Sequence, residues 1–183
     1  LHDSQNVVYA RRMKTVLQIT IFGLAILLCQ PALAGPYEDA AAAYIRRNYT
    51  EALQLWLPLA EQGNAAAQYN LGAMYENGHG VPRDNAEAEK WYRLSAGQGL
   101  ADAQFTLGVR YETGQGVPQN ITEALKWYRL AADQGFTRSQ YNLGVIYDNA
   151  NGVRRDLAEA AKWYRAAAEK GLAVAQVNLG LMH

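Results

Sequence analysis

The sequence predicts an all-α protein, a right-handed α-solenoid of antiparallel helix pairs with a 36-residue repeat. Three observations support this prediction. The pairs Leu-Gly and Trp-Tyr recur at a constant interval, a capping signal of Asp or Asn followed three residues later by Glu recurs with them, and a glycine follows each predicted second helix. A fixed period of this length is typical of proteins whose helix pairs stack in a row.

All the recurrences keep one register, with a step of 36 residues. Leu-Gly stands at 71–72, 107–108, 143–144 and 179–180, Trp-Tyr stands at 91–92, 127–128 and 163–164, and two further series are Gly63, Gly99, Gly135, Gly171 and Gln68, Gln104, Gln140, Gln176. We divide the chain into upstream residues and a signal peptide at 1–34 and a repeat domain at 35–183. The units lie at about residues 36–63, 64–99, 100–135 and 136–171, with a partial unit at 172–183.

The first 34 residues end in the pattern of a signal peptide. Met13 and Lys14 precede an apolar run at residues 19–28, and Ala34 closes a site suited to signal peptidase. We expect cleavage after Ala34 and export to the periplasm or outside the cell. The run is shorter than the roughly 20 apolar residues that span a bilayer, which makes an uncleaved anchor the weaker alternative. Cleavage also removes Cys29, the only cysteine, so the exported chain forms no disulfide.

The first helix of each unit, helix A, is clearest at residues 101–112. Ala103, Leu107 and Tyr111 are spaced by four residues and form one apolar helical face. The glycines and the proline of residues 114–118 cannot continue a helix, so helix A ends before them.

The second helix, helix B, begins at a capping signal. The side chain of Asn120 can accept the free N–H groups of the first turn, and Glu123 can reach back to the N–H of Asn120, which together make a capping box. Lys126 follows Glu123 by three residues and places a charged strip toward solvent. The helix ends at Gly135, where a left-handed backbone is expected. The other capping pairs are Asn48 with Glu51, Asp84 with Glu87, and Asp156 with Glu159.

A glycine recurs inside helix A, where it costs about 1 kcal/mol relative to alanine. Its recurrence as Gly72, Gly108, Gly144 and Gly180 therefore indicates the close approach of a neighbouring helix. The opposing surface is expected to be the alanine series Ala52, Ala88, Ala124 and Ala160.

The first unit departs from the pattern. Tyr44 stands seven residues before Glu51, whereas Tyr75 stands twelve before Glu87, so the Gly-Val-Pro insertion is absent. Pro58 lies inside its helix B and predicts a kink.

The last unit contains only a helix A. One interpretation is that the sequence is a fragment. The other is that the apolar face of Ala175, Leu179 and Met182 is exposed and covered by another chain, which would give end-to-end self-association through the incomplete C-terminal repeat.

The spacing Ala-x-x-Gln-x-x-Leu-Gly-x-x-Tyr, Gly-x-Gly-Val, Asp/Asn-x-x-Glu-Ala, Trp-Tyr, Gly resembles the Sel-one-like repeat (SLR), a relative of the tetratricopeptide repeat. The resemblance covers residues 37–183. It implies stacked helix pairs whose A helices line a concave, partner-binding surface, and proteins that assemble complexes in secretion, envelope maintenance or host contact.

Carried over by position, the resemblance implies a groove that combines aromatic rings with amides, a combination suited to an extended peptide. The alternative is that the rings belong to the core and the asparagines are solvated. Arg138 is included because its register holds Ala66 and Asp102 in earlier units. The candidate groove residues are Tyr69, Asn70, Phe105, Thr106, Arg138, Tyr141, Asn142 and Asn178.

An acid recurs near the C-terminus of helix A as Glu76, Glu112 and Asp148. The helix dipole disfavours a negative charge at this end. The acids either form a row that awaits a basic partner or pair with arginines such as Arg110, and the second interpretation is favoured.

Few residues could support catalysis. After residue 34 the only serines are Ser95 and Ser139, the only histidines are His79 and His183, and there is no cysteine. Neither serine matches a nucleophile motif, and His79 lies in a glycine loop, where a surface histidine is expected. We therefore expect no enzyme, no metal site and no cofactor.

The formal net charge is zero, so nothing indicates a nucleic-acid partner. The sequence thus predicts a non-catalytic protein–protein interaction adaptor or scaffold in the bacterial envelope or outside the cell, which binds a protein or peptide on the helix-A surface. The alternative is an envelope factor that binds peptidoglycan or an exopolysaccharide-synthesis complex. An enzyme that uses groove carboxylates comes third.

Overall fold

Residues 35–182, the part of the chain that the computed structural model describes, contain nine α-helices and no strand. The helices are α2 (Pro36–Ile45), α3 (Tyr49–Glu61), α4 (Ala65–Asn77), α5 (Asn85–Gly97), α6 (Ala101–Thr113), α7 (Ile121–Asp133), α8 (Thr137–Asp148), α9 (Leu157–Glu169) and α10 (Ala173–Leu181). The predicted signal peptide and its cleavage site lie outside the described residues.

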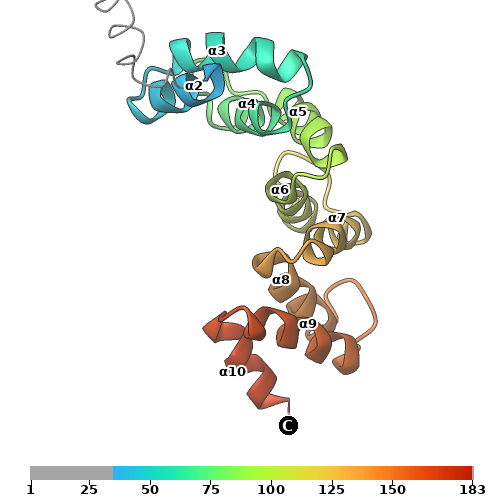
Figure 1. Ribbon diagram of the computed structural model, residues 1–183. Coiled ribbons are helices and arrows are strands. Elements are labelled where there is room, and N and C mark those ends of the chain that lie inside the picture. The colour runs from blue at the N-terminus through green and yellow to red at the C-terminus, as the bar shows by residue number, and fades with distance from the viewer. Residues whose placement is uncertain (1–34, 183) are drawn as a thin grey trace, which may run out of the picture. The chain divides into compact units, whose positions relative to one another are not determined.

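The helices follow one another in a row (Figure 1). Each one makes its extensive contacts with the helices next to it in sequence, which gives the A–B pairs α2–α3, α4–α5, α6–α7 and α8–α9, followed by α10 against α9. The buried side chains accordingly form three clusters along the row instead of one central core. This arrangement confirms the predicted all-α solenoid.

Helix A has the predicted face and end. In α6 the side chains of Ala103, Leu107 and Tyr111 are buried. The helix runs to Thr113, and Gly114 follows with a left-handed backbone at φ 75°. A carbonyl of the last turn, that of Arg110, accepts the N–H of Gly114.

Helix B begins at the predicted residues, but only one arm of the capping box is formed in each of the four helices, and in the first of them the N–H of Asn48 donates to the carbonyl of Ala43. The side chain of Asn120 accepts the N–H of Glu123 at 3.1 Å. The N–H of Asn120 donates to the carbonyl of Tyr111 at 2.8 Å, so the predicted reach of Glu123 to that group is wrong. Packing of helix A against helix B brings this carbonyl to the cap, and Glu123 pairs with Lys126 instead. The N–H groups of Asp84 and Asp156 donate to Tyr75 and Tyr147 in the same way.

The glycines inside helix A make the predicted close approach, but to a different residue. A Cβ added to Gly108 would lie 2.5 Å from the ring of Tyr128. Gly72 and Gly144 face the rings of Tyr92 and Tyr164 equally closely. The atoms nearest to each glycine therefore belong to the tyrosine of the Trp-Tyr pair and not to the alanine series, because the flat ring needs a site without a side chain on the facing helix. At Gly180 nothing lies within 4 Å, so the prediction is wrong there.

The glutamine of helix A links each unit to the unit before it. Its side-chain N–H donates to a carbonyl in the last turn of the preceding helix B, where carbonyls lack a partner within their own helix. The bonds are Gln68 to Ala60 at 2.9 Å, Gln104 to Ala96 at 3.1 Å, Gln140 to Ala132 at 3.1 Å and Gln176 to Ala168 at 3.2 Å.

The two ends of the row differ from the middle units. Only residues 46–48 join α2 to α3, which confirms that the first unit lacks the glycine loop, and α3 continues through Pro58 to Glu61. The prediction that the apolar face of α10 is exposed is wrong. Ala175 is fully buried against the preceding unit, and Leu179 and Met182 are half-buried. The exposed large apolar side chains of α10 are those of Val174, Val177 and Leu181.

No helix within residues 35–182 is both long and apolar enough to cross a membrane.

Candidate functional site

The aromatic residues predicted to line the groove pack against the tyrosine of helix B in the same unit. The ring centroids lie 5.5 Å apart for Tyr69 and Tyr92, 5.9 Å apart for Phe105 and Tyr128, and 5.8 Å apart for Tyr141 and Tyr164. Tyr69, Phe105 and Tyr141 are each half-buried. These rings therefore contribute to the core and still keep part of their surface in contact with solvent.

The amides of the predicted groove bind tyrosine hydroxyls of the preceding unit. The side chain of Asn70 donates to the hydroxyl of Tyr37 at 3.1 Å. The amides of Asn142 and Asn178 act on the hydroxyls of Tyr128 and Tyr164, whose pKa values they lower. All three asparagines are half-buried, as is Thr106 at the same register. The amide row thus lies at the junctions between units.

The acids at the ends of the A helices are held by groups of this chain. Glu76 forms an ion pair with the buried guanidinium of Arg110, as predicted, and accepts the hydroxyl of Tyr92 at 2.9 Å. Glu112 accepts the hydroxyl of Tyr128 at 2.6 Å. Asp148 pairs with Arg155 at 3.1 Å. The acids are engaged within the chain and do not form a free acidic row in the described residues.

These contacts shift the titration of two tyrosines. Burial raises the pKa of Tyr92 and of Tyr128 far above the ordinary value of 10.0. The carboxylates of Glu76 and Glu112 raise these pKa values further, because a second negative charge beside each carboxylate is unfavourable. Both hydroxyls therefore remain protonated donors.

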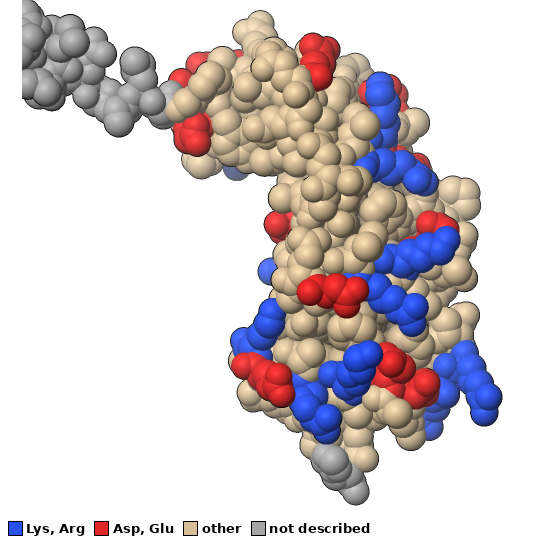
Figure 2. Space-filling view, turned by 45° about the vertical axis from the view of Figure 1, so that its right-hand side comes forward, with Lys and Arg blue, Asp and Glu red and all other residues tan. Residues whose placement is uncertain are grey.

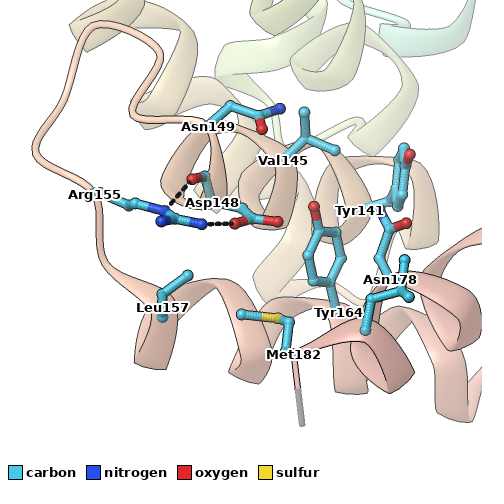
Figure 3. Close-up of a pocket in the computed structure, with 10 residues that line it drawn as sticks. Tyr141, Val145, Asp148, Asn149, Arg155, Leu157, Tyr164, Asn178 and Met182 are labelled. Atoms are coloured by element: carbon cyan, nitrogen blue, oxygen red, sulfur yellow. Dashed lines mark hydrogen bonds and ion pairs between the residues drawn. The ribbon is translucent and has the colours of Figure 1, made fainter.

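A cleft of about 490 Å³ opens between α8, α9 and α10 (Figure 3). It brings together two of the predicted groove residues, Tyr141 from α8 and Asn178 from α10. Its other lining residues are Val145, Asp148, Asn149, Arg155, Leu157, Tyr164, Leu181 and Met182.

The cleft has a polar interior and an apolar border. Arg155 lies along one side, where its Nε donates to the backbone carbonyl of Asp148 at 2.8 Å and its Nη2 pairs with the carboxylate. The ring of Tyr164 stands between this pair and Asn178 (Figure 3). Burial raises the pKa of the Tyr164 hydroxyl, while the side-chain amide of Asn178 acts in the opposite direction. Leu157 and Met182 supply apolar surface on the side away from Tyr141.

Arg138 lies at a second depression, of about 440 Å³, which it lines with Asp102, Gly135, Phe136 and Thr137. Asp102 and Arg138 hold the same register in successive units, so opposite charges stand one repeat apart on this surface. Both side chains are exposed.

His79 is more tightly held than its glycine loop predicts. Its Nδ1 lies 2.8 Å from the hydroxyl of Tyr44, and its ring stacks on Tyr49 with a centroid distance of 4.2 Å. The expectation of a plain surface histidine is therefore wrong, because the loop packs against the first helix pair.

The cleft contains neither Ser95 nor Ser139, and it does not contain His79. None of its lining residues is a serine, cysteine or histidine. Ser95 lies elsewhere, with its hydroxyl donated to the carbonyl of Ala65 at 2.7 Å, and Ser139 is fully buried. Across residues 35–182 there is no group of three His, Cys, Asp or Glu side chains that could hold a metal ion.

The charged side chains form no large patch of one sign on the face in Figure 2. Lysines and arginines lie among acids there. In the B helices, three ion pairs join residues three positions apart: Lys90 with Glu87, Lys126 with Glu123, and Lys162 with Glu159.

Several lining residues were not foreseen from the sequence, among them Tyr164, Arg155 and Leu157. Tyr164 belongs to a recurring Trp-Tyr pair, so the sequence indicates a structural residue rather than a binding residue. Arg155 and Leu157 flank the start of helix B, which carries only capping signals. The bend of the glycine loop brings them to the cleft, and no local pattern encodes that position.

Comparison with known proteins agrees with the repeat architecture. The Sel1 repeat profile matches residues 33–64, 65–100, 101–136 and 137–172. The crystal structure of a Sel1 repeat protein from Oxalobacter formigenes is 36% identical, with a TM-score of 0.75, and the alignment covers 79% of this chain and 60% of that one. The protective antigen c5321 of uropathogenic Escherichia coli strains, which displays an SLR fold, is 41% identical with a TM-score of 0.75, over 80% of this chain and 32% of that one.

The chain thus spans less than two thirds of the length of both solved relatives. No match was found among curated proteins. Sel1 repeats are generally protein–protein interaction modules and typically non-catalytic scaffolds. With four matched repeats and the solenoid of helix pairs, the chain belongs to the Sel1 repeat family.

Proposed function

We propose that this protein is a non-catalytic adaptor in the bacterial envelope or outside the cell, and that it holds an extended segment of a partner protein on its helix-A surface. The observation that carries the proposal is the cleft between α8, α9 and α10, where Tyr141 and Asn178 meet. The export pattern at residues 13–34 supports the location.

The chemistry of the cleft suits a peptide. The amide of Asn178 and the hydroxyl of Tyr141 can each donate and accept hydrogen bonds, as an extended peptide backbone requires. Val145, Leu157 and Met182 provide apolar contacts beside these groups. Sites that bind ligands commonly combine a few oriented polar groups with apolar walls in this way.

The test is a pull-down from the native cell with tagged protein. Tyr141→Phe combined with Asn178→Ala removes the polar groups and keeps the ring packed on Tyr164, so we expect the captured partner to be lost while the melting temperature changes little. Lys126→Ala is the control, because its side chain is exposed and paired only with Glu123. Capture that survives the double substitution, or recovery of glycan without protein, would refute the proposal.

A further inference from the structure

The glycine loop between α8 and α9 contains an asparagine directly before a glycine, Asn151–Gly152. Both residues are exposed, and Gly152 has a left-handed backbone with φ 68°. The residues at the register of Asn151 in the two preceding glycine loops are His79 and Gln115. Among these three loops, only the last one therefore places an asparagine side chain beside the backbone nitrogen of this glycine.

A second Asn-Gly pair, Asn77–Gly78, provides an internal comparison, because hydrogen bonds hold both of its amide groups. Asn77 is the last residue of α4, and its side-chain amide donates to the carbonyl of Ala73 at 2.8 Å. The backbone N–H of Gly78 donates to the carbonyl of Met74. Any reaction between these two amides must first break the last turn of the helix.

The corresponding groups of Asn151 and Gly152 are not held in this way within residues 35–182. The side chain of Asn151 is exposed, and the N–H of Gly152 has no backbone acceptor. The N–H of Asn151 donates to the carbonyl of Ile146 at 3.1 Å, which anchors the start of the loop and leaves the Asn151–Gly152 peptide unbonded. Exposed loops of this kind fluctuate at a lower cost in free energy than a hydrogen-bonded helix end.

We propose that Asn151 is a site of non-enzymatic deamidation through a cyclic succinimide. The backbone nitrogen of Gly152 attacks the side-chain Cγ of Asn151, and the amide nitrogen of Asn151 leaves as ammonia with the proton that the attacking nitrogen gives up. Water then opens the ring at one of its two carbonyls, which yields either aspartate or isoaspartate. The net reaction consumes water and releases ammonia. Glycine favours the attack because it has no Cβ to hinder the approach.

The modification changes the charge of a loop that borders the cleft between α8, α9 and α10. Asn149 and Arg155, from the same loop, line that cleft. The new carboxylate is ionised at neutral pH. It makes the loop at residues 149–156 neutral, because the charged residues there are Arg154, Arg155 and Asp156. The assignment of Asn151 as a modification site does not rest on the proposed function.

The test compares the two Asn-Gly pairs within one molecule. The purified 183-residue chain is incubated at mildly alkaline pH, and tandem mass spectrometry of its tryptic peptides detects the replacement of an NH2 group by OH. We expect Asn151 to convert at least about tenfold faster than Asn77, because Asn77–Gly78 must first lose two hydrogen bonds. In concentrated urea these bonds are absent, so we expect the two rates to converge.

Asn151→Gln is the matched control variant. It keeps the side-chain amide but requires a larger ring, so we expect conversion at residue 151 to stop while the rate at Asn77 stays unchanged. Labelling with an isoaspartyl methyltransferase identifies the isoaspartate product, and circular dichroism confirms that the incubated chain is folded.

Equal rates at Asn151 and Asn77 in the folded chain would overturn the inference. Conversion of Asn151 only after urea is added would overturn it as well. A rate difference that persists unchanged in urea would assign the effect to the neighbouring sequence instead of the folded loop, and it would contradict the structural argument.

Discussion

The first residue of the loop between helix A and helix B adopts a left-handed backbone conformation in three successive units. The first loop position is Gly78 in one unit and Gly114 in the next, with φ of 70° and 75°. In the unit after that, the same position holds Ala150, and its φ of 56° places a residue that has a Cβ in the left-handed region. A left-handed backbone costs a non-glycine residue roughly 1–2 kcal/mol.

Ala150→Gly is therefore expected to stabilise the protein by roughly 0.5–1 kcal/mol, since the relief of this strain exceeds the extra entropy of glycine in the unfolded chain. The measurement is the free energy of unfolding in urea. Ala161→Gly, inside α9, is the contrasting control and is expected to lose about 1 kcal/mol. A loss of stability with both variants would contradict this interpretation of Ala150.

Another single-residue feature is the buried ion pair of Arg110 and Glu76. Met74, Ile146 and Met182 occupy the register of Arg110 in the other units, so only one junction contains a charge at this position. The guanidinium also donates to the carbonyl of Asn85 at 3.3 Å. Removing one partner of a buried pair leaves the other without compensation.

Arg110→Met is expected to cost about 3 kcal/mol in the free energy of unfolding, at the lower end for buried pairs because Glu76 retains some solvent contact. Combining it with Glu76→Gln should restore most of that loss. Urea unfolding of the two single variants and the double variant forms the cycle, and purely additive losses would argue against coupling of the two side chains.

At the scale of the element, helix A is shaped by what packs on its glycine. The glycine weakens the helix, yet Gly108 and Gly144 each accept a tyrosine ring that an added Cβ would meet at 2.5 Å. The glutamine at the start of the same helix holds the end of the preceding helix B. Helix A thus packs through its glycine on helix B of the same unit, and it bonds through its glutamine to helix B of the preceding unit.

Two alanine substitutions at one register separate helix propensity from packing. Gly144→Ala is expected to destabilise the protein by roughly 1–3 kcal/mol, because the ring of Tyr164 must move. Gly180→Ala, with open space around it, is expected to stabilise by up to about 1 kcal/mol. Thermal melting of both variants gives the comparison, and a gain of stability at Gly144 would contradict the packing argument.

At the scale of the whole molecule, stability is the sum of junctions between neighbouring units, since the extensive contacts join helices adjacent in sequence. Two of these units place a buried tyrosine beside a carboxylate, Tyr92 beside Glu76 and Tyr128 beside Glu112. Because the pKa values of these tyrosines are raised, the stability of the whole repeat domain depends on pH.

Stability is expected to fall as pH rises above about 10, because the unfolded chain then loses the tyrosine protons and the folded chain keeps them. The stabilising contribution is fully present below this pH. Above this pH, each of the two tyrosines lowers the free energy of unfolding by about 1.4 kcal/mol for every pH unit. Urea unfolding at several alkaline pH values measures the slope, and Tyr128→Phe should reduce it by one tyrosine's share. An unchanged slope in that variant would refute the assignment.

The sequence by itself determined the helix pairs, their 36-residue register and the atypical first unit. These features depend on local signals: capping residues, helix-ending glycines and apolar spacing. It also favoured pairing of the acids at the ends of the A helices with arginines such as Arg110, and Arg110 pairs with one of these acids, Glu76.

Only the tertiary structure decided what the recurring residues face. The glycines meet tyrosine rings instead of alanines, the N–H of Asn120 meets a carbonyl instead of Glu123, and Ala175 is buried while Val177 is exposed. Each outcome depends on how one helix is rotated and placed against the next. A repeat of 36 residues specifies that the contact recurs, whereas the atoms that meet are set by packing between units.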